Sequence, residues 1–513
     1  MKIEIHDGFN SIGGNKISVC SRSGECFLLD FGINFSKWGE FFEEFLNPRT
    51  GRIVEDLLKL EIVPRIPVYR KDFPPADLHW DGRYRFVFMS HAHADHIGMV
   101  GLLSGNIPLV MTPETFSIAL TDSWVGAPKI WGSIASSERV DPRDVLVRKD
   151  LRESPRGRGA RPLERRVFIV DGENVNLPEG FKSVKACDIW DEFRVLRVYH
   201  SVIGASAIAV KVDEWWLVYT GDFRMGPKGK EKEYWLGSLG KERLSLAEST
   251  ERFVESVKDL HPMVLIVEGT RVTRKEKERE TTERDVYESA LGVVSSHRGL
   301  VLVDFPVRHV ERLFTFLKIA QETGRYLVLM PKDFAYLSAI EEIGWRVPHD
   351  RLRVYHPGKL RYVRKEREAM ERAIEGGMIV EPEDVTSSPD SFIMACGYFD
   401  MKEILDFPRE LLRDTIYIHS TSEAYTEEQE IDVKRFRNWL EFFSIEPYGV
   451  NFSRDEIRFT GEFHASGHVS SSDLEKLIDE LEPEVIVPVH TLDKGWFEKR
   501  WKSRVRTEKT LEI

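Results

Sequence analysis

The sequence predicts an α/β protein that contains a parallel, doubly wound sheet. Residues 83–89 are mostly aromatic and β-branched, which predicts a buried strand, and the residues from Asp95 onward have helical spacing up to Gly105. Strand and helix patterns alternate again between residues 300 and 330, as they do in parallel sheets covered by helices. With 513 residues, 42% of them hydrophobic, the chain is long enough for two or three domains with sizeable cores.

Composition and charge argue against several classes of protein. Residues 1–7 lack the apolar core of a secretory signal and no later stretch approaches a membrane span, so we expect a soluble cytoplasmic protein without a membrane partner. The formal net charge of -12 argues against a chain that coats itself with nucleic acid through global charge. An anionic partner would therefore meet a local basic surface. The four cysteines form no C-x-x-C pair, so buried free thiols are expected.

The first thirty residues read as short strands joined by turns, at 2–5, 17–20 and 26–29. The last strand ends at Asp30, and an aspartate in such a position favours a turn-capping role when no other context is available. Residues 33–80 form an insertion with aromatic and proline-rich stretches. This insertion is either a lid or a packing element, and the sequence does not distinguish the two.

Three histidines and one aspartate follow the predicted strand 83–89 within six positions. His91 and His93 lie two apart in extended chain and project the same way, while Asp95 and His96 lie on the following turn. A strand-to-helix loop is also where open α/β sheets place their chemistry. Imidazole and carboxylate suit a borderline metal such as zinc, and two metals roughly 3.5–4 Å apart need ligands from two sides and a bridging carboxylate. We therefore favour a metal site over loop residues with structural hydrogen bonds.

Two more polar residues occupy the ends of predicted strands. The strand 193–199 ends at His200, and the strands 207–212 and 215–219 lead to Asp222. Taken singly, either residue could be an ordinary loop residue.

A basic segment lies between residues 142 and 166. It holds nine Lys or Arg and four acidic residues, a local balance of +5. One interpretation is a solvated, mobile loop, and the other is a surface that guides a phosphate backbone without reading its sequence. Both interpretations stay open.

A second structural unit is predicted to start near Lys275 and to end near Val450. It follows the apolar strand 263–267, which ends at Glu268. Its expected elements are strands at 300–305, 326–330, 391–395 and 416–419 and helices after Val310, at 363–374 and after a capping box of Thr426 and Gln429. Arg308 and His309 either face a substrate channel or begin a helix, and we favour the second interpretation.

Further histidines that could belong to a functional site follow this unit. The strand 457–463 leads to His464-Ala465-Ser466-Gly467-His468, Ser472 with Glu475 is predicted to cap a helix, and the strand 485–489 ends at His490. Histidines at two strand ends, so far along the chain from the first cluster, are hard to explain as core packing.

The order of these motifs carries a family resemblance. His91-x-His93-x-Asp95-His96 resembles the signature of the metallo-β-lactamase fold superfamily. Together with Glu268, Ser466-Gly467-His468 and Pro488-Val489-His490, the sequence resembles the β-CASP branch, which contains RNase J, the polyadenylation-factor endonuclease and Artemis-type DNA nucleases. The resemblance implies a metallo-β-lactamase αββα sandwich at 1–274 and 451–513, with an inserted doubly wound β-CASP domain at 275–450.

The resemblance also implies a role for each motif residue. His91, His93 and His200 would hold one metal ion, Asp95, His96 and His490 the other, and Asp222 would bridge both. Asp30 would orient the histidine loop. Asp95, Glu268 and His468 are the expected catalytic residues, with His468, oriented by Glu268, protonating or stabilising the leaving oxygen. His464, Ser466, Gly467 and His468 would bind the substrate phosphates.

Within the branch, the 464–468 loop looks most like RNase J, and the short segment after His490 looks like archaeal members. The implied activity is a ribonuclease with two zinc ions that degrades single-stranded RNA from 5′ to 3′, with a homodimer as one possible assembly. Histidine at position 490 is typical of members that act on RNA. Thr491 and the insertions 33–80 and 132–166 depart from the family pattern. Four alternatives stay open: an RNA-processing endonuclease, a DNA nuclease of the same family, a catalytically silent RNA-binding subunit and a small-molecule metallohydrolase.

Overall fold

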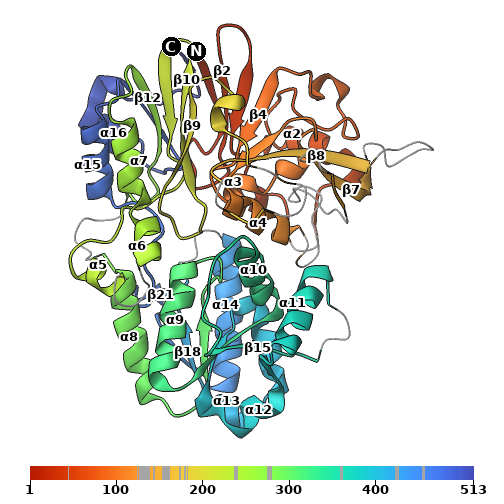
Figure 1. The fold of residues 1–513 in the computed structure, drawn as a ribbon, viewed down its shortest axis with the longest axis vertical. Helices are drawn as coiled ribbons and strands as arrows, with labels where there is room; N and C mark the ends of the chain where they lie inside the picture. Colours follow the sequence, from red (N-terminus) through yellow and green to blue (C-terminus); the bar gives the residue numbers. More distant parts are fainter. Residues whose placement is uncertain are drawn as a thin grey trace.

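Two lobes built on three main sheets make up the protein in the computed structural model (Figure 1). The structure describes residues 1–43, 46–123, 125, 139–141, 145–152, 162–172, 175–177, 181, 183–235, 241–273, 280–358, 362–421, 427–452 and 457–513. Among these residues, no helix has both the length and the apolar character needed to cross a membrane.

The first lobe contains a nine-stranded and a five-stranded sheet. In spatial order the first is β23 (Thr510–Glu512), β1 (Lys2–Asp7), β2 (Lys16–Cys20), β3 (Cys26–Leu29), β4 (Tyr84–Phe88), β5 (Leu109–Met111), β8 (Pro162–Ile169), β7 (Val145–Arg152) and β6 (Arg139–Asp141). The second is β22 (Val485–Val489), β12 (Met263–Glu268), β11 (Trp215–Tyr219), β10 (Ser206–Val212) and β9 (Phe193–Arg197). Because β1 pairs with β23, the two chain ends lie side by side.

These two sheets pack face to face around one shared core. Ile3 and Phe86 of the larger sheet lie in one buried cluster with Leu217 and Ile266 of the smaller sheet. Helices cover the outer faces. The larger sheet carries α2 (Ile53–Lys59) and α4 (Pro113–Asp122), and the smaller carries α7 (Ser249–Val257), α15 (Ser471–Leu481) and α16 (Gly495–Trp501). The lobe is therefore layered helix, sheet, sheet, helix.

Residues 33–80 act as a packing element. Ile53, Val54 and Leu57 of α2 are fully buried against the outer face of the larger sheet, in a cluster with Leu28 and Val87. Two short elements, α1 (Phe35–Gly39) and η2 (Ala76–Leu78), belong to the same stretch.

The helix predicted from Asp95 to Gly105 is wrong as one continuous helix. The chain forms one turn, α3 (Ala94–Ile97), and then a 3₁₀ turn, η3 (Val100–Leu102). Gly98 ends α3, and a side chain there would meet the carbonyl of Ala94, so tight packing in this turn explains the break.

Two buried arginines hold the turn that follows α3. Arg165, on β8, donates hydrogen bonds to three carbonyls, those of Leu103 (2.8 Å), Ser104 (2.9 Å) and Val100 (3.3 Å). Arg70 donates to the carbonyl of Gly101 at 3.2 Å. Burial, together with the neighbouring Arg70, lowers the pKa of Arg165 to about 9. Segments distant in sequence thus fix the chain next to the histidine loop.

The second lobe holds a seven-stranded sheet in which every neighbouring pair is parallel. Its strands are, in order, β16 (Ile379–Val380), β15 (Leu352–Tyr355), β14 (Tyr326–Leu329), β17 (Phe392–Ala395), β13 (Val301–Asp304), β18 (Ile416–His419) and β19 (Glu446–Tyr448). The helices around it are α8 (Glu283–Ser296), α9 (Val310–Thr323), α10 (Pro331–Glu342), α11 (Arg364–Glu375), α12 (Pro382–Ser387), α13 (Arg409–Arg413) and α14 (Glu427–Phe443). Val301 and Val303 face one core and Leu302 the other, so helices cover both faces and the predicted alternation is present.

Smaller elements connect the lobes. They are α5 (Lys230–Tyr234), α6 (Lys241–Ala247) and a two-stranded sheet of β20 (Val450–Phe452) and β21 (Ile457–Phe459). Arg308 and His309 precede α9, and His309 is its N-cap residue, as the favoured interpretation predicted. Arg308 also links the lobes, because it donates a hydrogen bond to Asp122 of α4 at 2.7 Å.

Two local predictions are wrong. Cys20 and Cys26 face each other across β2 and β3 and form a disulfide, and of the two free cysteines Cys187 is exposed and only Cys396 is buried. The hairpin register, which spacing alone does not reveal, explains the pairing. The cap of α15 is Ser470, whose side chain accepts a hydrogen bond from the Asp473 amide, and not Ser472.

Two other predictions fall partly or wholly outside the described residues. Thr426, the predicted cap of α14, is one of them. In the basic segment, β7 and β8 form an antiparallel pair, but residues 142–144 and 153–161 lie outside the described part of the chain.

Replacing Arg165 with Met should lower the free energy of unfolding by about 2–4 kcal/mol. Three backbone carbonyls lose their buried donor, and this loss exceeds the gain from removing one buried charge. Denaturant unfolding measures this change. The matched control is Arg166→Met, at the neighbouring exposed position, which should change stability by no more than about 0.5 kcal/mol. Equal effects of the two substitutions would contradict the role given to Arg165.

Candidate metal centre

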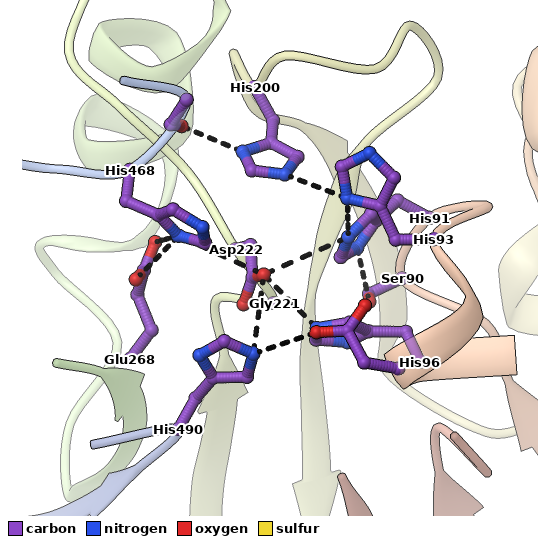
Figure 2. A network of polar contacts seen from close by, with 12 residues as sticks. Ser90, His91, His93, His96, His200, Gly221, Asp222, Glu268, His468 and His490 are labelled. Carbon is purple, nitrogen blue, oxygen red and sulfur yellow. Dashed lines mark hydrogen bonds and ion pairs between the residues drawn. The ribbon is translucent and has the colours of Figure 1, made fainter. Parts of the chain in front are cut away.

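The polar residues singled out in the sequence meet at one edge of the first lobe. His91 to His96 follow β4, His200 follows β9, Asp222 follows β11, and His490 follows β22. Since β11, β12 and β22 are parallel neighbours, their carboxyl ends open on the same edge. Figure 2 shows these side chains pointing toward a common centre, with Asp222 in the middle.

Two groups of side chains here have the geometry to hold metal ions. The first is His91, His93 and His200, and the second is Asp95, His96, Asp222 and His490; within each group the ligand atoms lie within 4.8 Å of one another. Asp222 lies between them, because its Oδ2 is 3.0 Å from His96 Nε2 and 3.8 Å from His91 Nε2. A carboxylate in this position can bridge two cations.

Four of the histidines are oriented through one ring nitrogen. Their Nδ1 atoms make hydrogen bonds as follows: His91 with Ser90 Oγ (3.0 Å), His96 with Asp30 Oδ2 (2.8 Å), His200 with the Gly467 carbonyl (2.7 Å) and His490 with Thr270 Oγ1 (2.9 Å). The Nε2 atoms are thereby turned to the common centre. Histidine ligands of metal ions are usually oriented in this way, by a hydrogen bond to the ring nitrogen that does not bind the metal.

The donor set fits a cation of the zinc type. It combines imidazole nitrogens with carboxylate oxygens, which such metals accept. Asp222 is 1% exposed, and its Oδ1 accepts no hydrogen bond from any described residue. A buried carboxylate oxygen without a donor is costly unless a positive ion satisfies it.

The ionisation of His91 agrees with this fit, whereas His96 responds to the carboxylates around it. Burial, with the positive neighbours His93 and His96, holds the pKa of His91 well below its usual range. Burial opposes the charged form of His96 too, but Asp222, Asp95 and Asp30 together raise its pKa well above the usual value. A neutral His91 is the form that binds a metal ion.

Asp30 organises the histidine loop. This carboxylate is fully buried and accepts hydrogen bonds from the Ser90 amide (2.7 Å), the Ser90 hydroxyl (2.7 Å), the Tyr219 hydroxyl (2.6 Å) and His96 Nδ1 (2.8 Å). Gly221 has a φ of +57°, and a Cβ there would lie 2.7 Å from the Cβ of Ser90, so only glycine fits beside this loop.

Glu268 and His468 form a second polar pair beside Asp222. His468 Nδ1 lies 3.0 and 3.2 Å from the two carboxylate oxygens of Glu268 and 3.8 Å from Asp222 Oδ2. Burial would lower the pKa of His468, but Glu268 raises it above the usual value. Because His468 also forms a potential ligand group with His200 and Asp222, geometry alone allows either a proton donor or a ligand.

Some residues of the 464–468 loop contact the potential metal ligands, and others line a large cavity. Gly467 contacts His200 through its carbonyl, and the Ser466 hydroxyl accepts a hydrogen bond from the His468 amide at 3.3 Å. His464 is half-buried, and its desolvation holds its pKa well below the usual range. It lines the cavity and belongs to none of the three potential ligand groups found among the described residues.

This cavity lies between the lobes and has a volume of about 1110 Å³. His464, Ser466 and His468 form part of its wall, which also carries the cationic side chains of Lys228 and Arg284. Through His468 the cavity adjoins the potential metal ligands His200 and Asp222.

Two residues that hold the site were not singled out in the sequence. Thr270 bridges Glu268 and His490, and Arg224 donates a hydrogen bond to the Ser466 carbonyl at 3.0 Å. Thr270 stands two residues after Glu268 and Arg224 two after Asp222, so proximity to a motif residue was the available signal.

The chain is thus a mixed α/β protein with His and Asp clusters that can hold metal ions. It is similar to two proteins named Ribonuclease J. The one from Pyrococcus abyssi is 22% identical over 506 residues, which cover 96% of this chain and 89% of the relative. The one from Methanocaldococcus jannaschii is 22% identical over 370 residues, which cover 69% of this chain and 66% of the relative. No protein-family model matches the chain.

The fold also resembles that of a solved structure. The crystal structure of a protein of unknown function from Enterococcus faecalis V583 superposes with a TM-score of 0.63 at 21% sequence identity, covering 100% of this chain and 99% of that chain. At this identity the likeness concerns the fold alone.

Replacing Asp30 with Asn should weaken metal binding by about 10- to 100-fold, because an amide nitrogen would face donors that now share one carboxylate. Competition with a chromophoric chelator measures the affinity. Asp171→Asn, at an exposed position, serves as the control and should leave the affinity unchanged. If both variants bound metal as tightly as the unaltered chain, Asp30 would not orient the ligands.

Proposed function

We propose that this protein is a metal-dependent ribonuclease of the RNase J type, with a metallo-β-lactamase fold and an inserted β-CASP domain. The observation that carries the proposal is the convergence of His91, His93, His200 and of Asp95, His96, His490 on either side of Asp222. The similarity to two proteins named Ribonuclease J supports the same activity.

The layered first lobe and the parallel sheet of the second support the fold assignment. We assign residues 1–274 and 451–513 to the metallo-β-lactamase domain and residues 275–450 to the β-CASP domain. The seven-stranded sheet falls between Val301 and Tyr448, inside the proposed insert.

We assign two zinc ions to the two ligand groups, with Asp222 shared. When bound, such a pair supplies a nucleophile at neutral pH and neutralises charge that develops on a phosphodiester. Residues of the protein orient the ligands and bind the substrate. Asp30 and Thr270 fix the ligand orientation, and the cavity holds the strand beside the ligands.

His468 is the proposed proton donor to the leaving oxygen. Glu268 favours its protonated form, and Glu268 is itself held by the Phe223 amide (2.8 Å) and by the Thr270 hydroxyl (2.5 Å). The imidazolium is therefore positioned beside Asp222, where the scissile phosphate would lie.

The favoured polarity is 5′ to 3′, and the second candidate is an endonuclease on RNA or DNA. The resemblance of the 464–468 loop to that of RNase J favours the first, because this loop would hold the phosphate of a chain end. The intact set of ligands argues against a catalytically silent RNA-binding subunit.

His468→Ala should reduce turnover of single-stranded RNA by about 10²- to 10⁴-fold, because the leaving oxygen loses its proton donor. Zinc content, measured by mass spectrometry after gel filtration, should stay at the unaltered value. The control is His261→Ala, an exposed histidine that pairs with Glu484. Loss of zinc from the His468 variant would mean that His468 is a ligand.

Linear RNA with a 5′-monophosphate should be degraded faster than RNA with a 5′-triphosphate, and circular RNA of the same sequence should resist. Time courses with end-labelled and internally labelled RNA compare the three. Cleavage of circles at the full rate would replace the exonuclease by the endonuclease, and cleavage of single-stranded DNA at the same rate would remove the RNA preference.

A further inference from the structure

A second buried carboxylate, Glu283, lies behind the 464–468 loop. It is the first residue of α8 in the second lobe and is 1% exposed. Arg224 and Arg312 both donate to it: Arg224 Nη1 lies 3.5 Å from Oε1, and Arg312 Nε lies 3.1 Å from Oε2. His309 Nε2 lies 3.2 Å from Oε1. One carboxylate therefore anchors two guanidinium groups.

Arg224 connects Glu283 with the metal centre. Its Nη1 donates to the Ser466 carbonyl at 3.0 Å, two residues before His468. Its own amide donates to the Tyr199 carbonyl at 2.7 Å, next to His200, and its position is two residues after Asp222. The same side chain thus contacts the loop of His468 and lies on the segment of the bridging aspartate.

Arg312 connects Glu283 with the start of the same loop. Its Nη1 donates to the Phe463 carbonyl at 3.0 Å and to Ser420 Oγ at 2.5 Å, and the Ser420 hydroxyl donates to the Phe463 carbonyl at 2.7 Å. Arg312 itself is fully buried. The loop is consequently fixed at Phe463 from the second lobe and at Ser466 from the first.

These contacts are strong because they are buried and charged. Charge-assisted hydrogen bonds are about twice as strong as neutral ones, and an anionic partner offsets the cost of burying a guanidinium. Arg312 and His309 outweigh the effect of burial and hold the pKa of Glu283 well below its usual range. Glu283 is therefore the charge that keeps both arginines in place.

We infer that Glu283 is a positioning residue for His468: through Arg224 and Arg312 it fixes the 463–468 loop so that the His468 imidazole lies beside Asp222. Glu283 itself contacts neither metal group, and the inference rests on the proposed ribonuclease function for its catalytic part. The insert would then contribute to catalysis through this clamp as well as by forming a wall of the cavity.

Glu283→Gln, which keeps the shape and removes the charge, tests this inference in the full chain. The matched control is Glu322→Gln, an exposed glutamate of α9 that accepts a hydrogen bond from Tyr287 of α8 at 2.6 Å and is not among the described residues that line the cavity. Hydrogen exchange of the peptide 463–469, zinc content, and kcat and KM on single-stranded RNA are measured for both. Glu231 and Glu311 also lie near Arg224, so the variant retains some counter-charge and is expected to fold.

Glu283→Gln should speed exchange of the peptide 463–469 and lower kcat by about 10- to 100-fold, because small misplacements of a catalytic group are costly, while KM and zinc content stay within twofold. Glu322→Gln should match the unaltered chain. Glu283→Asp, which restores the charge on a shorter side chain, should recover part of kcat.

Unchanged exchange in Glu283→Gln would overturn the inference, and so would faster exchange with an unchanged kcat. If this variant does not fold, Ser420→Ala removes one neutral contact to Phe463 and is read in the same way. An unaltered chain that cleaves no RNA would overturn the proposed function instead, while the exchange comparison would still decide whether Glu283 holds the loop.

Discussion

A buried negative charge requires compensation, and the carboxylate of Asp222 sets this requirement for the whole site. Its Oδ2 lies 3.0 to 3.8 Å from ring nitrogens of His91, His96, His468 and His490. These four histidines come from three loops that are up to about four hundred residues apart along the chain, so the fold must bring distant segments together at one point. Cations held by the two ligand groups would also compensate the charge of Asp222. Metal binding would therefore depend on the packing of the first lobe, which brings these groups together.

Two residues of the site have an unfavourable backbone conformation. Asp30 and His490 both have positive φ, +56° and +51°, which non-glycine residues rarely adopt. Such conformations cost on the order of 1–3 kcal/mol and persist where surrounding contacts hold them. At Asp30 four hydrogen bonds converge on the side chain, and at His490 Thr270 holds the ring and the Gly8 carbonyl accepts a hydrogen bond from the amide. Two of the nine described non-glycine residues with positive φ therefore belong to the candidate site.

Much of the site could be predicted from local sequence, and the rest depended on resemblance. His91 to His96 lie within six positions, so their convergence is a property of one loop. His490 could be linked to that loop only through a family pattern, because nothing local shows that β22 lies next to β12. Thr270 and Arg224 were missed since a hydroxyl or guanidinium near a motif has many equivalent uses. The Cys20 and Cys26 disulfide and the break after Ile97 depend on register and tight packing, which spacing does not encode. The alternating strands and helices of the second lobe were predictable because their period is local.

The double attachment of the 463–468 loop limits how the two lobes can move. A hinge that swung them apart would separate Arg224, which follows β11 of the first lobe, from Glu283 of the second, and Arg312 from the carbonyl of Phe463. Separation of the lobes is therefore incompatible with keeping both attachments of the loop. If the loop keeps both attachments, a polymer can enter the space between the lobes only through the existing opening of the cavity.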